Sequence, residues 1–343
     1  MKTTNATSGL QKYKNRLVLI SCYYGSFPEW MDLWLLTCGW NPDIDFLLVS
    51  DLALPERPQN VHLLPLTMEE LRERFSRVLG FDAALSTPYK LCDYKPLYGL
   101  AFREELKGYA FWGHCDLDII WGRLGHFLTD EVLDVYPRIG VFGHCIAYRN
   151  DEEMNNLYRK EGAAFPYMTV FRDDAHYGFD ELTGMNLILE KHGIPYYKDF
   201  PVADANWLLP RVSADAVKSG EEFYCWWKGR ILCARVRDGR VWVKEYAYLH
   251  FQKKKPLYRK DAAYANGFYI KANAFVPRKP GRFTVEEVER ESEFLGPFRD
   301  YADVAKGQSK RAVELLFCKS RHEKKILLVK KCKHLAFQLQ CKK

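Results

Sequence analysis

The chain has 343 residues, of which 48% are hydrophobic and 28% are charged, a balance that excludes a disordered or collagen-like protein. Its net charge of +7 would suggest a nucleic-acid partner if that charge were spread over the surface. Residues 304–343, however, hold 12 Lys and Arg against two Glu, a net of +10, which leaves −3 for the other 303 residues. Because the main body is mildly acidic, we expect no nucleic-acid partner.

The ten cysteines form no C-x-x-C motif and no zinc-type pairing with histidine, so we expect reduced thiols instead of a disulfide framework. Residues 1–14 are polar and lack the apolar run of a secretory signal. No uncharged stretch approaches the roughly 20 apolar residues that span a bilayer. We therefore expect a cytoplasmic protein.

The first half of the chain alternates apolar runs with helical patterns. Residues 16–21 and 44–50 are predicted buried strands, the first followed by a Tyr-Tyr-Gly loop. Thr67 can cap a helix, and Glu70 three residues later completes a capping box. The later elements of this half are a predicted helix and a predicted strand, over residues 96–106 and 109–117. This alternation predicts an α/β fold with a mostly parallel sheet.

The second half has a different pattern. Residues 224–237 and 240–248 are aromatic and β-branched, and they meet at Asp238-Gly239, a strong signal for a β-hairpin. From Pro256 to Pro297 the chain is rich in loop-forming residues.

The C-terminal tail follows a helical pattern in which apolar side chains share one face, namely Leu328, Cys332, Leu335 and Leu339. We expect three parts: an α/β domain over 15–255, a loop-rich extension over 256–303 and a basic amphipathic helical tail over 304–343.

The sharpest chemical feature is an apolar run that ends in Asp116-Leu117-Asp118. The carboxyl edge of an open α/β sheet is where ligands bind. Alternation along an extended chain points both carboxylates to one side, so that both can reach one cation. Oxygen ligands select a hard ion such as Mg²⁺ or Mn²⁺, which would bridge phosphates. The alternative is a pair of solvated loop acids.

This D-x-D region, together with residues 90–99, resembles that of nucleotide-sugar-dependent glycosyltransferases with the GT-A fold. More narrowly, it resembles a mostly uncharacterised bacterial family found in capsule and lipopolysaccharide gene clusters. The resemblance covers about residues 16–255. It implies a GT-A-like, Rossmann-like central sheet with a C-terminal β-hairpin, and Mn²⁺ or Mg²⁺ held by Asp116 and Asp118.

The resemblance also implies a donor site. The first strand and its loop hold the nucleotide in that fold, so Ser21, Cys22, Tyr23 and Tyr24 would line a uridine pocket with Asp51 beside it.

Lys90, Asp93 and Lys95 form a second group in the expected donor site. Asp93 matches an acidic position that contacts ribose or donor-sugar hydroxyls in similar enzymes. Pro96, early in the predicted helix, instead favours a capping role for Asp93, and both roles stay open. Lys95 is expected near the phosphates.

His250 is the candidate for the late histidine that often completes the metal site in GT-A enzymes. A neutral imidazole can bind the cation, and Lys253 and Lys254 can stabilise the charge that builds on a departing diphosphate. A packed strand histidine followed by a solvated charge run is the alternative, but the position after a D-x-D favours the site.

An inverting transferase needs a carboxylate that accepts the proton of the acceptor hydroxyl. Asp180 and Glu181, at the head of a predicted helix, lie where GT-A enzymes usually hold the acceptor and the base. Asp180 as a helix N-cap is the alternative. A retaining enzyme would need no such base.

Three further residues have two interpretations each. His144 either contacts a sugar or is a buried strand histidine, and Trp226 and Trp227 form either a sugar-stacking platform or part of the core.

These features predict a metal-dependent glycosyltransferase that moves a hexose from a nucleotide sugar, expected to be a UDP-sugar, to a surface-polysaccharide acceptor. The basic tail suits an interfacial helix on an anionic membrane, so we expect a peripheral location on the inner face of the plasma membrane and a glycan or lipid-linked glycan acceptor. A helix packed on the body is the alternative for the tail. Two other classes stay open, a glycoside hydrolase and a non-catalytic membrane-associated protein that binds a sugar or nucleotide.

Overall fold

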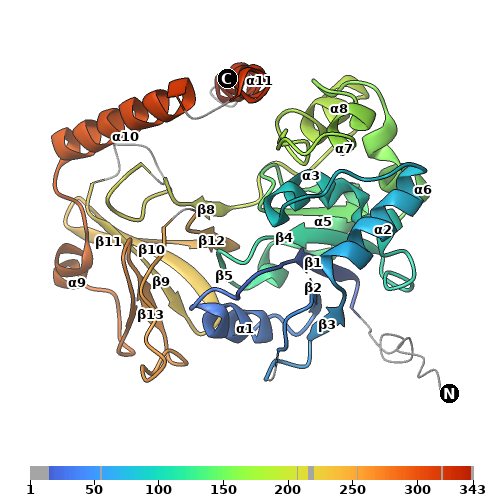
Figure 1. Ribbon diagram of the computed structural model, residues 1–343. Helices are drawn as coiled ribbons and strands as arrows, with labels where there is room; N and C mark the ends of the chain where they lie inside the picture. Colours follow the sequence, from blue (N-terminus) through green and yellow to red (C-terminus); the bar gives the residue numbers. More distant parts are fainter. Residues whose placement is uncertain are drawn as a thin grey trace.

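The computed structural model describes residues 15–54, 56–206, 208–214, 220–252, 254–317 and 320–340 (Figure 1). An α/β lobe is built on a six-stranded sheet, and a second lobe is built on a five-stranded sheet. A three-stranded sheet lies between the two lobes (Figure 1). The mixed α/β class expected from the sequence is confirmed.

The first sheet has the strand order β3-β2-β1-β4-β7-β6. Its first four strands are mutually parallel, whereas β7 runs antiparallel to both β4 and β6. The strands are β1 (Leu17–Cys22), β2 (Ile44–Ser50), β3 (Val61–Pro65), β4 (Phe111–Cys115), β6 (Arg138–Ile139) and β7 (Cys145–Arg149).

Both faces of this sheet are covered, which explains why β1 and β2 are mostly apolar along their whole length. Leu17 and Leu19 pack with helix α1 (Met31–Gly39), and Val18 and Ile20 pack on the other face with helix α2 (Met68–Leu79). The predicted capping box at the start of α2 is confirmed. The shorter helices of this lobe are α3 (Leu91–Tyr94), α4 (Tyr98–Ala101), α5 (Asp130–Val135), α6 (Glu152–Asn155), α7 (Tyr167–Phe171) and α8 (Met185–Lys191), with 3-10 turns at Pro88–Lys90, Lys95–Leu97, Leu124–His126 and Leu157–Arg159.

The single helix predicted over 96–106 is wrong, since the segment divides into the 3-10 turn Lys95–Leu97 and the one-turn helix α4. Pro96 lacks an N–H to donate within a helix. Gly99 lies so close to Trp112 that a Cβ would come within 2.6 Å of the indole nitrogen, so this turn packs directly on β4.

The second lobe is an antiparallel sheet in the order β11-β10-β9-β13-β14. The Asp238-Gly239 hairpin is confirmed between β10 and β11, but the predicted strand 224–237 is two strands, β9 and β10. Lys228 and Gly229 both have positive φ and form a second tight turn there. The bounds are β9 (Glu222–Trp227), β10 (Arg230–Arg237), β11 (Arg240–Tyr246), β13 (Phe268–Ile270) and β14 (Phe275–Pro277), with helix α9 (Val285–Glu291) packed beside them.

The three-stranded sheet has the order β5-β12-β8, with β5 (Ile119–Trp121), β12 (Tyr248–His250) and β8 (Val202–Asp204). β12 follows the hairpin of the second lobe after a single residue, and β5 follows the D-x-D of the first lobe. This small sheet therefore joins the two lobes at the position of the D-x-D.

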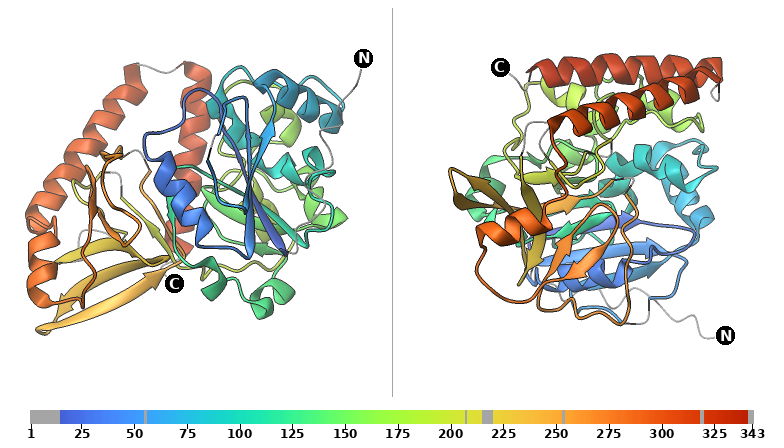
Figure 2. Two further views of the ribbon diagram at one scale, coloured as in Figure 1. Left: turned by 90° about the horizontal axis from the view of Figure 1, so that it is seen from below. Right: turned by 90° about the vertical axis from the view of Figure 1, so that its left-hand side faces the viewer.

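Two long helices, α10 (Pro297–Phe317) and α11 (Arg321–Gln340), lie on one side of the molecule (Figure 2). α11 packs on the α/β lobe through Ile326, which is only 3% exposed and belongs to the core around α7 and α8. A Cβ at Gly307 of α10 would approach Leu208 to 2.6 Å, so α10 lies against the loop after β8. Within the described ranges, every helix is too short or too polar to cross a lipid bilayer.

Candidate functional site

His250 lies where the three short strands meet. In the register of β12, His250 is opposite Ile119 of β5 and opposite Asp204 of β8. Asp118 immediately precedes β5, so the pairing brings its carboxylate to one side of the imidazole and that of Asp204 to the other. The two lobes thus supply one shared group of polar side chains.

The structure brings Asp116, Asp118 and His250 together, as the sequence predicts. Their ligand atoms all lie within 4.8 Å of one another. Nε2 of His250 is 3.3 Å from Oδ2 of Asp118, and the side chains of Asp116 and Asp118 are 33% and 28% exposed, so a ligand can reach them. Two carboxylates and an imidazole suit Mn²⁺, and the carboxylates alone suit Mg²⁺. These residues therefore fit a divalent cation.

The protonation of His250 is also compatible with a cation at this position. Burial by itself lowers the pKa of His250, but its hydrogen bonds to Asp118 and Asp204 and the charges of these two acids raise it to about 10. The imidazolium thus supplies one positive charge between two carboxylates. A divalent cation can take over this charge balance, since the imidazole must lose a proton to bind it.

Lys95 connects this group to the predicted base. Its ammonium donates to Oδ1 of Asp116 and to the carbonyl of Gly143, both at 2.7 Å, and lies 3.5 Å from Oδ2 of Asp180. Asp180 therefore lies at the same site as the D-x-D. It does not cap α8, whose N-cap position is Gly184, so the capping alternative is wrong.

Asp180 has an unusual protonation equilibrium. Burial raises its pKa to about 7, an effect that Lys95 opposes and the neighbouring charge of Glu181 reinforces. Glu181 accepts a hydrogen bond from the N–H of Gly143 at 2.8 Å. A Cβ at Gly143 would come within 2.4 Å of Oδ2 of Asp180, so only glycine allows the acid to lie this close to the backbone.

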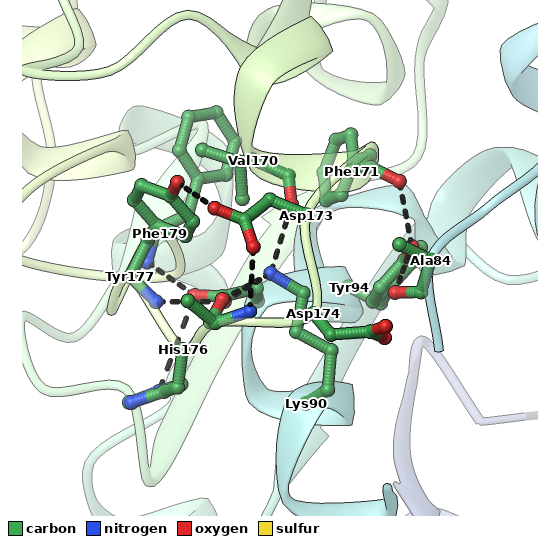
Figure 3. Close-up of polar contacts among 12 residues, drawn as sticks. Ala84, Lys90, Tyr94, Val170, Phe171, Asp173, Asp174, His176, Tyr177 and Phe179 are labelled. Carbon is green, nitrogen blue, oxygen red and sulfur yellow. Dashed lines mark hydrogen bonds and ion pairs between the residues drawn. The ribbon is translucent and has the colours of Figure 1, made fainter. Parts of the chain in front are cut away.

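The predicted donor contacts of Lys90 and Asp93 are corrected by the structure. Both side chains are fully buried, and they form an ion pair of 2.9 Å. Lys90 also donates to the carbonyl of Val170 (Figure 3) and to that of Ala175. Its ammonium has no N–H left for a ligand.

Asp93 accepts hydrogen bonds from the N–H groups of Tyr177 and Phe179 at 2.8 and 2.9 Å. Burial alone would raise its pKa, but the charges of His176 and Lys90 and these two hydrogen bonds lower it. It does not cap a helix, so the alternative role is also wrong. Lys90 and Asp93 instead hold the segment that leads into Asp180.

The predicted uridine pocket is only partly accessible. Ser21 is 3% exposed and its hydroxyl donates to the carbonyl of Cys115, so it ties β1 to β4 instead of facing a ligand. Tyr24 is also buried, with its hydroxyl donating to the carbonyl of Thr67 at 3.4 Å. Tyr23 is half-buried, and both its burial and, to a smaller extent, the nearby charge of Asp118 raise the pKa of its hydroxyl. Asp51 is exposed.

Lys253 and Lys254, which follow β12, were expected to stabilise a departing diphosphate, but the one that the structure describes is bonded elsewhere. Lys254 donates to the carbonyl of Leu209 at 2.7 Å, and burial lowers its pKa. Lys253 lies outside the described residues.

Sequence reasoning missed Asp204, which accepts a hydrogen bond from Nδ1 of His250 at 2.8 Å. The only available signal was a short apolar run, Val202-Ala203, that ends in an acid. His144 lies against His250 with ring centroids 4.0 Å apart, and its Nδ1 is hydrogen-bonded to the hydroxyl of Tyr248. Trp226 is fully buried and stacks on Phe268, so for this residue the core interpretation is confirmed.

The C-terminal helix also reaches the site region, which the sequence did not indicate. His322, Ile326 and Lys330 recur every four residues on the face of α11 that packs on the body. Lys330 donates to the carbonyl of His176 at 3.0 Å and lies beside Gly178. This part of the tail therefore belongs to the body.

A model of one protein family matches residues 19–279, which include most of both lobes and every acid and histidine of the site. The chain belongs to a family of unknown function, DUF6625. None of the curated proteins matches the chain. The DUF6625 region ends before α9, so α10 and α11 lie outside it.

The buried pair behind the site gives a test of its structural role. Replacing Asp93 with Asn leaves Lys90 buried without its counter-charge, and we expect a loss of about 3–5 kcal/mol in the free energy of unfolding. Urea denaturation measures this loss. The control is Glu152→Gln, which breaks the exposed pair of Arg103 and Glu152 and should cost less than about 1 kcal/mol. Equal stability of the two variants would contradict the assignment.

Proposed function

We propose that the chain is a metal-dependent glycosyltransferase that transfers a hexose from a nucleotide sugar, such as a UDP-sugar, to a surface-polysaccharide acceptor. The observation that carries the proposal is the cluster of Asp116, Asp118 and His250. The order β3-β2-β1-β4 reverses direction between β1 and β4, and open α/β sheets bind ligands beyond the carboxyl ends of the strands at such a switch point. Asp116 follows β4 directly and Tyr23 follows β1, so both lie at this position.

The strand order and parallel pairing also support a GT-A-like fold for the α/β lobe. Four parallel strands with an antiparallel neighbour next to β4 are compatible with that fold. The small sheet that carries His250 would then supply the late histidine of the metal site.

Each polar residue has a distinct role in the proposed reaction. Asp116, Asp118 and His250 would hold Mn²⁺ or Mg²⁺, which when bound would neutralise the charge on the diphosphate. In an inverting reaction the acceptor oxygen bonds to the anomeric carbon as the bond to the β-phosphate oxygen breaks. Asp180 receives the acceptor proton, and its pKa near 7 suits a general base at neutral pH. Lys95 holds Asp116 and Asp180 in place.

A glycoside hydrolase is a second candidate, favoured by one observation. A carboxyl group with a pKa of about 7 can also protonate a leaving group, which is the role of the general acid in that reaction. Hydrolysis of a glycan without any nucleotide sugar would support this class. The metal-ligand cluster favours the transferase, since the general acid–base mechanism of hydrolysis requires no cation.

We further propose that the tail, together with the segment just before it, contacts an anionic membrane surface through its outer side. Leu295 before α10 and Phe298 and Tyr301 early in α10 are 74%, 87% and 56% exposed, and Leu328 of α11, within the tail, is 63% exposed. Leu328 lies among the lysines of α11, and exposed apolar side chains near basic ones are typical of interfacial helices. The inner face of α11 packs on the body, so membrane contact and packing use different faces.

The metal-dependent reaction can be tested with a panel of nucleotide sugars. We expect release of the nucleoside diphosphate in Mn²⁺ and none in chelator. Because a bound cation contributes several kcal/mol of charge stabilisation, Asp118→Asn should reduce the rate roughly 100-fold or more. The exposed acid Asp82 provides the control Asp82→Asn, which should keep the native rate. Turnover in chelator, or a fully active Asp118→Asn, would contradict the mechanism.

The role of Asp180 predicts a pH profile. Since the carboxylate form accepts the proton, we expect the rate to rise from about pH 6 to about pH 8, and Asp180→Asn to lower it by roughly 10²–10⁴-fold.

The folded chain binds a proton at Asp180 more tightly than the unfolded chain, so ionisation of this group costs stability as pH rises to about 7. Asp180→Asn should therefore be at least as stable as the native chain at about pH 8 in thermal unfolding. The control is Glu190→Gln on the exposed face of α8, and native activity of Asp180→Asn would exclude this base.

Membrane contact is best tested by point substitutions, because deleting the tail would expose the core around Ile326. The full chain should sediment with vesicles that contain phosphatidylglycerol and not with phosphatidylcholine alone. Phe298→Ser combined with Tyr301→Ser should weaken this binding several-fold. Val135→Ser, which removes an equally exposed apolar side chain from α5, is the control. Equal binding by both variants would contradict the proposed contact.

A further inference from the structure

We propose that Asp204 is the residue that positions His250 for the cation, by holding Nδ1 so that Nε2 faces the D-x-D carboxylates. This inference rests on the proposed metal site. It assigns a role to a residue that neither the motif nor the family match identifies.

The contacts of His250 separate its two nitrogens. Nδ1 is 2.8 Å from Oδ1 of Asp204, and Nε2 is 3.3 Å from Oδ2 of Asp118. Both carboxylates can only accept, so without a cation the imidazolium faces one acid with each nitrogen; when a cation takes Nε2, Asp204 keeps the remaining proton on Nδ1. Metal-binding histidines are commonly fixed by such a second carboxylate.

Asp204 is itself held in place. The parallel pairing of β8 and β12 places it directly opposite His250. Its Oδ1 also accepts a hydrogen bond of 2.7 Å from Nε2 of Gln252. Gln252 has a φ of +52°, a conformation that costs free energy for any residue other than glycine, and this turn points its amide at Asp204. The strand pairing and the hydrogen bond from Gln252 thus both fix the position of Oδ1 of Asp204.

The same residues allow a competing arrangement. His144, Asp204 and His250 also have ligand atoms within 4.8 Å of one another, so they form a second set of three that shares His250 with the first. One neutral imidazole offers a single lone pair, so His250 serves only one set at a time.

The D-x-D set is favoured by the contacts of His250, because Asp204 holds Nδ1 at 2.8 Å and only Nε2, which faces Asp118, is left for a cation. Nδ1 of His144 is hydrogen-bonded to the Tyr248 hydroxyl, and Nε2 of His144, 3.9 Å from Oδ1 of Asp204, makes no hydrogen bond to that acid. The ring of His144 lies flat against that of His250, with an interplanar angle of 27°. His144 therefore supports the ring of His250 from the side, and Asp204 determines its orientation.

Direct measurement of Mn²⁺ binding tests this assignment without any sugar donor. Free Mn²⁺ can be followed by electron paramagnetic resonance during titration of the full chain. We expect Asp204→Asn to weaken Mn²⁺ binding roughly 10–100-fold, because loss of a second-shell carboxylate typically has this effect. Asp199→Asn, an exposed acid five residues earlier, should bind Mn²⁺ like the native chain. His144→Phe, which keeps a ring against His250, should also stay within about threefold of it.

Nitrogen-15 spectra of the histidines give a second readout, which loss of stability alone would not produce. With diamagnetic Zn²⁺ bound, which accepts imidazole ligands, His250 should carry its proton on Nδ1 in the native chain, and this preference should weaken in Asp204→Asn. Native Mn²⁺ affinity in Asp204→Asn, or a proton on Nε2 of His250 in the cation-bound native chain, would overturn the inference. Loss of binding in His144→Phe equal to that in His250→Gln would instead assign the cation to the second set and also overturn it.

The outcomes for this inference and for the proposed function can be told apart. Metal-dependent sugar transfer with unchanged Mn²⁺ binding in Asp204→Asn would refute the role of Asp204 alone. The expected loss of Mn²⁺ binding in a chain that transfers no sugar would refute the transferase and leave the role of Asp204 intact. A native chain that binds no Mn²⁺ would refute both.

Discussion

The buried ammonium of Lys95 is the interaction on which the candidate site depends. It lies between Asp116, the carbonyl of Gly143 and Asp180. Burial alone would lower the pKa of Lys95, but the nearby acids, Asp116 foremost, hold it well above its ordinary value, so the group is positively charged. Without this charge, the acids after β4 and before α8 would repel one another in a region with little water. One lysine thus allows the candidate metal ligands and the predicted base to share a site.

Other positively charged groups balance carboxylates on both sides of Lys95. Behind the site, Lys90 balances Asp93, and the pair holds the backbone of the segment before Asp180. At the junction of the lobes, His250 balances Asp118 and Asp204. Each acid therefore has a positive group or hydrogen-bond donors within reach, which lets several carboxylates gather without unfolding the chain. A bound cation would extend this balance to a diphosphate.

Much of the local structure could be predicted because it depends on neighbours in the sequence. The apolar runs of β1 and β2, the capping box at Thr67 and the Asp238-Gly239 turn all agree with their predictions. The incorrect predictions concern residues whose local structure or side-chain role depends on contacts with distant segments of the chain. The predicted helix over 96–106 divides into two short turns, the second packed on Trp112 through Gly99, and the Ser21 hydroxyl donates to the carbonyl of Cys115. Asp93 likewise bonds backbone groups more than 80 residues away.

The sequence by itself determined the main candidates for the site, since an acid pair after an apolar strand and a late histidine can be recognised from residue type and order. It also determined the charge division between an acidic body and a basic tail. Only the tertiary structure decided which of these groups meet, because strand register brings Asp204 to His250 and a buried lysine brings Asp180 to Asp116. It also decided that one face of α11 belongs to the body, since burial of Ile326 depends on a surface formed by segments far away in the chain.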